Sequence, residues 1–222
     1  FGKTALDNLS SELANYGDTV LLMYGKNAVK KIGLYDKVID ILNNSGKKVI
    51  ELAGIKPNPS YSQLIKGAKL VRENNVDLIL AVGGGSSMDT AKAIGIIIEN
   101  PEFADVRSLE GVAPTKNKCV PIIAVPTTAG TAAEVTINYV ITDVENNRKM
   151  VCVDVHDIPV VAVVDPDMME TMPKGLTAAT GMDALTHAIE GYITKGAWEL
   201  SDMFHLKAIE IIARSLRGAV EN

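Results

Sequence analysis

The sequence is poor in the residues on which several classes of protein depend. It holds two cysteines, three histidines and one tryptophan among its 222 residues, and aromatic residues make up 5% of the chain. Cys119 and Cys152 each lie in an apolar, strand-like run, which indicates buried free thiols and not a disulfide framework or a metal-binding pair. With so few histidines, any metal site has few nitrogen ligands available.

Long hydrophobic runs and an excess of positive charge are also absent. No apolar stretch approaches the roughly 18 residues of a membrane helix, and FGKTALDNL at the N-terminus has no signal-peptide core. The 22 Lys and Arg residues are outnumbered by 27 Asp and Glu residues, which gives a net charge of -5. Binding to nucleic acid needs a basic surface. We therefore expect a cytoplasmic protein with no nucleic-acid partner and no membrane partner.

The sequence does contain a regular alternation of strand-like and helix-like segments. Short apolar runs rich in β-branched residues predict buried strands at 20–24, 47–52, 77–82, 120–126 and 160–165. Between the first four runs, helical spacing of apolar residues predicts helices in NAVKKIGLYDKVIDILNNSG, SYSQLIKGAKLVRENN and SSMDTAKAIGIIIEN. This order predicts the α/β class, with a Rossmann-like parallel sheet covered by helices on both faces.

Only helical patterns remain after Pro166. LTAATGMDALTHAIEGYI and SDMFHLKAIEIIARSLRGAV predict two helices, and Gly191 and Gly196 are expected to break the chain between them. The change of pattern predicts an α/β domain over residues 1–166 and an all-helical domain that begins at residue 167 and continues to 222.

The segment DLILAVGGGSSMDTAKAIG gives the strongest indication of a cofactor. A buried strand runs into Gly83, Gly84 and Gly85, and Ser86 then opens a helix with Asp89 in its first turn. Glycines let the backbone approach a pyrophosphate, while the helix N-terminus supplies N–H groups and the positive end of a dipole. The spacing is not the usual G-x-G-x-x-G. The alternative is that the glycines serve only tight packing between strand and helix.

Two other strand ends carry small polar residues. VPTTAGTAAEVT places Thr127, Thr128 and Thr131 around Gly130, and IKPNPS places Asn58 between two prolines. Hydroxyl and amide groups in such positions can hydrogen-bond a phosphate or a nicotinamide amide. Each segment taken alone is also compatible with an ordinary turn.

One helical segment holds a pair of metal-ligand residues, Asp183 and His187. Positions i and i+4 share one helix face, so a carboxylate and an imidazole can converge on a cation such as Fe(II) or Zn(II). The alternative is a structural hydrogen bond between the two side chains. His156 is expected in a surface turn and His205 is eighteen positions beyond His187, so neither is expected to complete the site.

Together these ordered motifs resemble the iron-containing alcohol dehydrogenase family, also called group III. KPNP, AVGGGSSMDTAKA, VPTTAGTAAE and AATGMDALTHAIEGY all match its pattern, and the resemblance spans nearly the whole chain. Residues from about 93 to 222 resemble its lactaldehyde reductase branch. Residues from 1 to about 92 resemble its NADP-dependent butanol dehydrogenase or aldehyde reductase branch. Such a split is compatible with natural divergence or with a chimera.

The resemblance implies hydride transfer between a nicotinamide and a small alcohol or aldehyde, of the lactaldehyde/1,2-propanediol or butanal/butanol type. It assigns Asp183 and His187 as the first two ligands of a divalent metal. It assigns the glycine loop, Asn58, the three threonines and Lys149 to cofactor binding. The family's other two metal ligands are histidines that would lie beyond Asn222, so the resemblance implies a truncated chain.

The residue that follows the first predicted strand, Gly25, bears on the choice between NAD(H) and NADP(H). NAD-preferring members of the family present an aspartate at the position of Gly25, where a carboxylate would repel a 2′-phosphate. Gly25 with Lys30 and Lys31 nearby would accept that phosphate, so we expect NADP(H) in preference to NAD(H). The alternative is that Gly25 starts a turn and the lysines form a solvated helix face.

Three functions remain compatible with the sequence. The first is a metal-dependent NAD(P) alcohol dehydrogenase, and the second is a dinucleotide-binding module without turnover. The third is an assembly-type or designed protein in which the helices of residues 175–220 form an oligomer interface. The apolar faces of these helices lead us to expect a homo-oligomer, most simply a dimer.

Overall fold

The structure is a computed structural model that describes residues 1–221. Contacts divide the chain into two compact units. The sheet unit comprises Phe1–Thr127 and Ala133–Met168, and the helical unit comprises Thr128–Ala132 and the chain from Met169 onward. Within the described residues, no helix has the length and apolar character needed to cross a bilayer.

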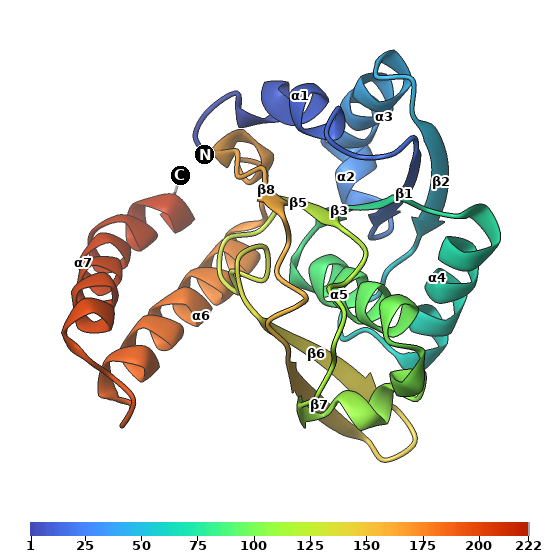
Figure 1. Cartoon of the computed structure of the whole chain (residues 1–222). Helices are drawn as coiled ribbons and strands as arrows, with labels where there is room; N and C mark the ends of the chain where they lie inside the picture. The colour runs from blue at the N-terminus through green and yellow to red at the C-terminus, as the bar shows by residue number, and fades with distance from the viewer. Residues whose placement is uncertain (222) are drawn as a thin grey trace. The chain divides into compact units, whose positions relative to one another are not determined.

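A five-stranded parallel sheet forms the centre of the sheet unit, with strand order β2-β1-β3-β5-β8 (Figure 1). β1, β3 and β5 are buried almost throughout because helices cover both faces, which is why their sequences are continuously apolar. The predicted parallel sheet and α/β class are therefore confirmed. The strands are β1 Thr19–Tyr24, β2 Lys48–Ala53, β3 Leu78–Gly83, β5 Ile122–Pro126 and β8 Val161–Ala162.

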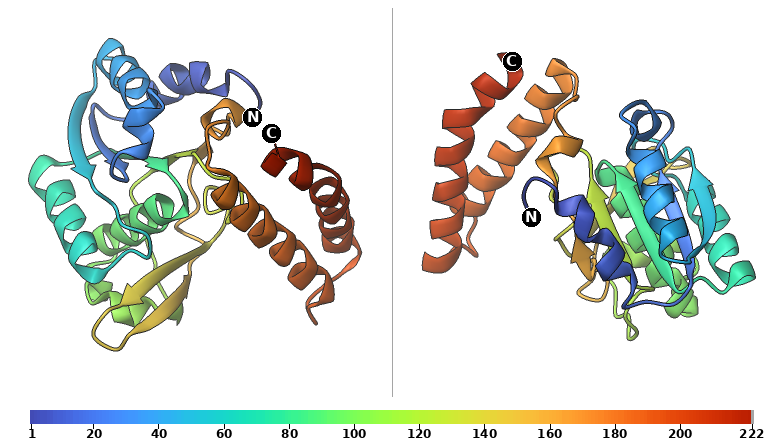
Figure 2. Two further views of the ribbon diagram at one scale, coloured as in Figure 1. Left: turned by 180° about the vertical axis from the view of Figure 1, so that it is seen from behind. Right: turned by 90° about the horizontal axis from the view of Figure 1, so that it is seen from above.

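Helices lie on both faces of this sheet (Figure 2). Alternate residues of β1 point to opposite faces, so Leu22 packs with Leu42 in one cluster and Leu21 packs with Leu64 in the other. The first face carries α1 Leu9–Leu13, α2 Ala28–Lys31 and α3 Leu34–Asn44, and the second carries α4 Tyr61–Asn74 and α5 Gly85–Glu99. Short 3₁₀ turns occur at Ala5–Asn8, Pro101–Phe103, Val106–Leu109 and Pro166–Met168.

The first predicted helix is two helices in the structure. Gly33 takes φ +71°, a left-handed conformation that ends α2 and redirects the chain into α3. Gly46, with φ +69°, follows the end of α3, and its N–H donates to Asn43 O at 3.0 Å. A glycine in the left-handed conformation is typical of a helix C-terminus.

A second, smaller sheet was not predicted from the sequence. It has the strand order β4-β7-β6, from β4 Gly111–Val112, β6 Asn138–Asp143 and β7 Arg148–Val153. β6 and β7 form an antiparallel hairpin. Cys152 lies in β7 as a buried free thiol, whereas Cys119 is buried but precedes β5, so the expectation that Cys119 lies in a strand was wrong.

The helical unit contains α6 Lys174–Ile193 and α7 Glu199–Glu221. The chain breaks between them around Gly196 as predicted, but α6 continues through Gly191, so the predicted break at Gly191 was wrong. A Cβ atom at Gly191 would lie 2.3 Å from His205 Nε2. Glycine is therefore needed there for close approach of the two helices and not for a turn.

Candidate functional site

The turn between β3 and α5 has the geometry of an anion-binding loop. Gly83 takes φ +145°, and a Cβ atom there would lie 2.7 Å from Ser87 Oγ. Gly84 is the N-cap of α5, and among the described residues no side chain caps this helix. The N–H groups of the first turn can therefore bind a phosphate with the help of the helix dipole. Gly85 and Ser86, also predicted for this site, occupy the same turn.

The predicted threonine segment is divided between the two units. Thr127 follows β5, which pairs with β3, and its N–H donates to Gly83 O at 2.9 Å. This hydrogen bond fixes Thr127 beside the glycine turn. Thr128 and Thr131 belong to the helical unit instead, which the sequence did not anticipate.

Within the helical unit, Gly130 brings the segment 128–132 against α6. A Cβ atom at Gly130 would lie 2.7 Å from Thr180 O and 3.3 Å from Asp183 Oδ2. Only glycine allows this approach without displacement of the segment or the helix. The threonine segment therefore lies directly beside the predicted metal ligand Asp183.

Asp183 and His187 fit part of a metal site. Oδ1 of Asp183 lies 3.5 Å from Nε2 of His187, and the side chains are 42% and 58% exposed. Two ligands about 2.1 Å from one ion at a tetrahedral angle would be about 3.4 Å apart, so the pair can converge on one cation. Within residues 1–221 no third acidic, histidine or cysteine side chain joins them. The alternative, a direct hydrogen bond between the pair, is not formed at this separation.

The other two histidines have different surroundings. His156 Nδ1 lies 3.1 Å from Asp154 Oδ1 and 3.0 Å from Thr115 Oγ1. His205 packs against Gly191 in the helical unit. Each ring is therefore held by contacts other than Asp183 and His187.

The end of β6 brings together the turn that carries Asn58 and the strand that carries Lys149. Thr142 N–H donates to Pro59 O at 2.8 Å, and Thr142 is the register partner of Lys149 in β7. Asn58 has φ +56° in an exposed turn, and Lys149 is also exposed. These two predicted cofactor contacts, far apart in the sequence, therefore lie on segments that flank β6 of the small sheet.

Lys30 is held in place near the end of β1. Its ammonium lies 4.4 Å from the ring centroid of Tyr35 and 5.4 Å from that of Tyr24, within the range of cation–π attraction. Both tyrosine hydroxyls donate to Glu51, at 3.0 Å and 2.6 Å. Lys30 is the third residue of α2, which follows the turn at Gly25, and the two tyrosine rings define the surroundings of its ammonium.

Two titratable residues of α5 face the small sheet. Asp89, predicted as a cofactor contact, accepts a hydrogen bond from the Val140 N–H, and burial raises the pKa of its carboxyl to about 6. Lys92, which the sequence analysis missed, is fully buried. The available signal was its position in TAKAIGIII, where it is flanked by small and apolar residues on every side.

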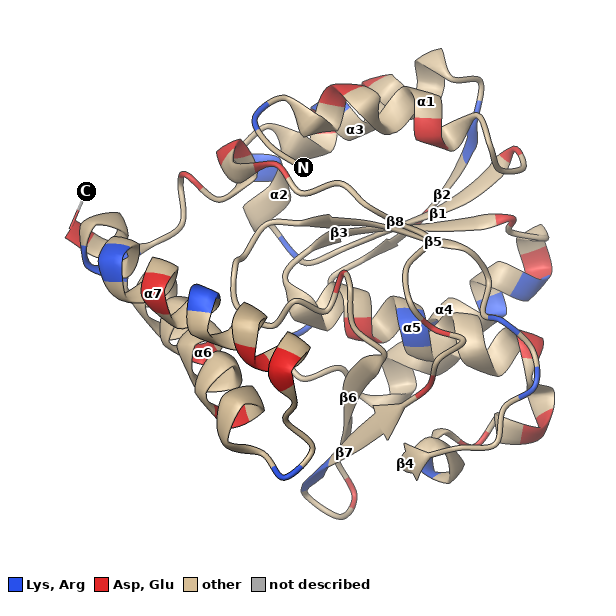
Figure 3. Ribbon diagram, turned by 60° about the vertical axis from the view of Figure 1, so that its left-hand side comes forward, with Lys and Arg blue, Asp and Glu red and all other residues tan. Residues whose placement is uncertain are grey.

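The tip of the β6–β7 hairpin is charged (Figure 3). Arg107 pairs with Asp143 and Glu145, and Arg148 pairs with Glu110 at 2.5 Å. The Asn146 side chain donates to Asp143, and this hydrogen bond holds the pKa of that carboxyl below its ordinary value. These ion pairs order the hairpin turn.

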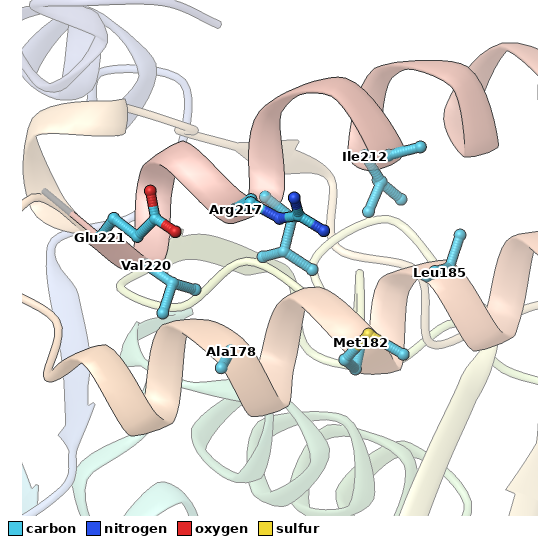
Figure 4. Close-up of a pocket in the computed structure, with 9 residues that line it drawn as sticks. Ala178, Met182, Leu185, Ile212, Arg217, Val220 and Glu221 are labelled. Carbon is cyan, nitrogen blue, oxygen red and sulfur yellow. The ribbon is translucent and has the colours of Figure 1, made fainter.

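The helical unit has an apolar groove of about 360 Å³ (Figure 4). Its walls are side chains of α6 and α7 that point toward one another across the helix pair. None of the predicted site residues is among them. The lining residues are Ala178, Met182, Leu185, Ile212, Ala213, Leu216, Arg217, Val220 and Glu221.

Two family models match the chain. Residues 1–166 match the model described as iron-containing alcohol dehydrogenase. Residues 177–222 match the model described as the C-terminal domain of the Fe-containing alcohol dehydrogenase family. The motifs described above lie within these two matches.

Individual relatives extend the comparison. The chain is 54% identical over 220 residues to lactaldehyde reductase of Escherichia coli K12, covering 99% of this chain and 58% of that protein. It is 41% identical over 223 residues to the NADPH-dependent butanol dehydrogenase of Clostridium saccharobutylicum, covering 100% and 56%. The structure of an alcohol dehydrogenase from Oenococcus oeni superimposes with a TM-score of 0.92 at 36% identity, covering 100% and 58%. Each relative matches both halves of the chain, and the chain spans 56–58% of their length.

Proposed function

The chain belongs to the iron-containing alcohol dehydrogenase family, and from this we propose that it acts in hydride transfer between a nicotinamide cofactor and a small alcohol or aldehyde. The substrate pairs we propose are lactaldehyde with 1,2-propanediol and butanal with butanol. We assign cofactor binding to a domain of residues 1–166. We assign metal binding to the helical residues from 167 onward.

The observation that carries this proposal is the glycine turn after β3. Its backbone reaches the N-terminus of α5 without a side chain in the way, and Thr127 is hydrogen-bonded to Gly83 at its side. Such a turn at the carboxyl edge of a parallel sheet suits the pyrophosphate of a dinucleotide. Asn58 and Lys149, brought together at the small sheet, are our further candidates for cofactor contact.

Asp183 and His187 would hold the metal ion, Fe(II) or Zn(II). A bound divalent ion supplies Lewis-acid stabilisation of the substrate oxygen. The two side chains are half-exposed, so they leave room for other ligands on the same ion. The segment around Gly130 passes close to the Asp183 carboxylate.

For the cofactor we propose NADP(H) in preference to NAD(H). Gly25 leaves no carboxylate at the end of β1 to repel a 2′-phosphate, and the ordered ammonium of Lys30 offers it a counter-charge. The NADPH dependence named for the Clostridium saccharobutylicum relative agrees with this choice.

We further propose a homodimer. Large apolar side chains of α6, α7 and the segment between them are exposed in the structure, including Trp198, Met203 and Phe204 at 62–66%. Exposure of this extent is typical of surfaces that another chain segment or another subunit covers. Light scattering of the purified protein would test the dimer directly.

The proposed activity is tested by NADPH oxidation with lactaldehyde or butanal. The assay is run anaerobically with and without added Fe(II), and NADPH binding is followed by fluorescence in the same samples. Turnover that depends on Fe(II) would support the dehydrogenase function for this chain. Binding without turnover would instead support the second candidate, a dinucleotide-binding module. Absence of binding would overturn both.

A further inference from the structure

β6 is an edge strand whose free side faces helix α5. It is the last strand in the order β4-β7-β6, so β7 pairs with only one of its sides. In a strand, the N–H and C=O groups of every second residue point to the same side. The groups of residues 136, 138, 140 and 142 therefore point away from β7, and buried backbone groups of this kind need partners.

Lys92 of α5 supplies partners for two of these residues. Its ammonium donates to Thr136 O at 2.5 Å, to Asn138 O at 2.9 Å and to Thr136 Oγ1 at 3.3 Å. An ammonium has three N–H donors, and in Lys92 all three donate to oxygen atoms of Thr136 and Asn138. Lys92 thus occupies the place that a neighbouring strand would otherwise take.

Two further groups complete the same edge. Asp89, one turn before Lys92 on α5, accepts the Val140 N–H. Pro59 O accepts the Thr142 N–H at 2.8 Å. Between residues 136 and 142, α5 side chains and the turn that carries Asn58 therefore bond four of the outward backbone groups on this side of β6: Thr136 O, Asn138 O, and the N–H groups of Val140 and Thr142.

The buried carboxyl of Asp157 is close to Lys92 but is not its hydrogen-bonding partner. Asp157 Oδ1 lies 3.9 Å from the Lys92 ammonium, and both Asp157 side-chain oxygens lack any hydrogen bond among the described residues. Burial raises the pKa of the Asp157 carboxyl, which weakens its pairing with the Lys92 ammonium. The backbone carbonyls, and not an ion pair, define the position of Lys92.

We propose that Lys92 and Asp89 are positioning residues that hold the β6–β7 hairpin in register with the helix of the glycine turn. The functional part of this inference rests on the proposed cofactor site. Lys149 lies on β7 opposite Thr142, so the hairpin sets where its ammonium lies relative to a pyrophosphate bound at the N-terminus of α5. Asp89, like Lys92, acts through the hairpin in this proposal.

The first test is hydrogen exchange on the Lys92→Met variant, which keeps the bulk of the side chain and removes its donors. We expect exchange of the Val140 and Thr142 amides to accelerate about tenfold or more, with β1 and β3 unchanged. The matched control is Asp157→Asn, because Asp157 lies in the same buried cluster but makes no hydrogen bond to β6. In this control, we expect the exchange rates of the Val140 and Thr142 amides to change by less than about twofold. Unchanged exchange in Lys92→Met, or an equal effect of Asp157→Asn, would overturn the proposal.

A second variant protects the test against misfolding of Lys92→Met. Asp89→Ala removes one acceptor and leaves Lys92 in place. It should accelerate exchange of the Val140 amide specifically. Protection of Val140 at the wild-type level in a folded Asp89→Ala protein would also overturn the proposal.

The functional part is tested by a double-mutant cycle with Lys149→Ala and the NADPH Kd as readout. Lys92→Met should raise the Kd about tenfold when Lys149 is present and less than about twofold when it is absent, because Lys92 acts through Lys149. If Lys92 has a purely structural role, Lys92→Met should raise the NADPH Kd by the same factor with and without Lys149. That result would refute the functional part of the proposal. If the wild-type protein binds no NADPH, the cofactor proposal and this functional part both fail, while the exchange result still decides whether Lys92 and Asp89 hold the hairpin.

Discussion

The substitution Gly83→Ala should destabilise the turn between β3 and α5 for two separable reasons. A non-glycine residue at φ +145° carries a backbone strain of about 1–3 kcal/mol. The new Cβ atom would also lie 2.7 Å from Ser87 Oγ in a site where Ser87 is 3% exposed, which adds overpacking of about 1–3 kcal/mol. We expect a total loss of about 2–6 kcal/mol in the free energy of unfolding.

Urea unfolding followed by circular dichroism measures this loss, and two further variants separate its causes. Ser87 Cβ would be 3.5 Å from the new methyl group, an ordinary contact. Adding Ser87→Ala should therefore recover the overpacking part and leave the strain. Gly218→Ala is the matched control, because a Cβ there meets nothing within 4 Å in α7. It should stabilise by up to about 1 kcal/mol.

The same variant reports on the cofactor site. If the glycine turn binds the pyrophosphate, Gly83→Ala should raise the NADPH Kd by about tenfold or more under conditions in which the protein is folded. Gly83→Ala with wild-type stability would refute the steric reasoning. Wild-type NADPH affinity in a protein that is measurably destabilised would refute the assignment of the turn to the cofactor.

Three other substitutions test different parts of the structure. Gly130→Ala should destabilise the helical unit by about 1–3 kcal/mol, because its Cβ would lie 2.7 Å from Thr180 O; faster hydrogen exchange in α6 measures this, and unchanged exchange would contradict it. Gly25→Asp should raise the NADPH Kd about tenfold and leave NADH binding little changed, as measured by fluorescence titration; equal losses for both nucleotides would argue against a 2′-phosphate site. Burial raises the pKa of Asp157 from 3.8 to about 8, so the native state keeps a proton that the unfolded state releases, and stability should fall as pH rises between these values. Asp157→Asn should remove this slope, and urea unfolding that gives parallel pH profiles for the two proteins would contradict it.

The central sheet could be predicted from the sequence because its strands are buried on both faces. Continuous apolar runs such as Leu78–Gly83, separated from one another by helical segments, are typical of parallel strands covered on both sides. The hairpin of β6 and β7 was missed because one face of each strand is exposed, so polar residues interrupt NYVITD and RKMVCV. The alternation of buried and exposed residues in these strands was the available signal.

The glycine turn and the Asp183–His187 pair could be proposed from the sequence because each requires only local geometry. Lys92 could not be assigned in this way, because a lysine on a helix is solvated in most proteins and its burial depends on where β6 lies. The prediction for Gly191 was wrong for a related reason. Its role is close approach to His205 of another helix, and contacts of this kind depend on tertiary packing.

The closed edge of β6 also affects how the protein behaves at high concentration. An open strand edge is a template on which strands of other molecules can pair, and this is a common route to aggregation. Side chains of α5 and the turn at Pro59 already occupy that edge, and the opposite edge strand of the small sheet, β4, is only two residues long. The small sheet therefore gives neighbouring molecules little backbone on which to build an intermolecular sheet.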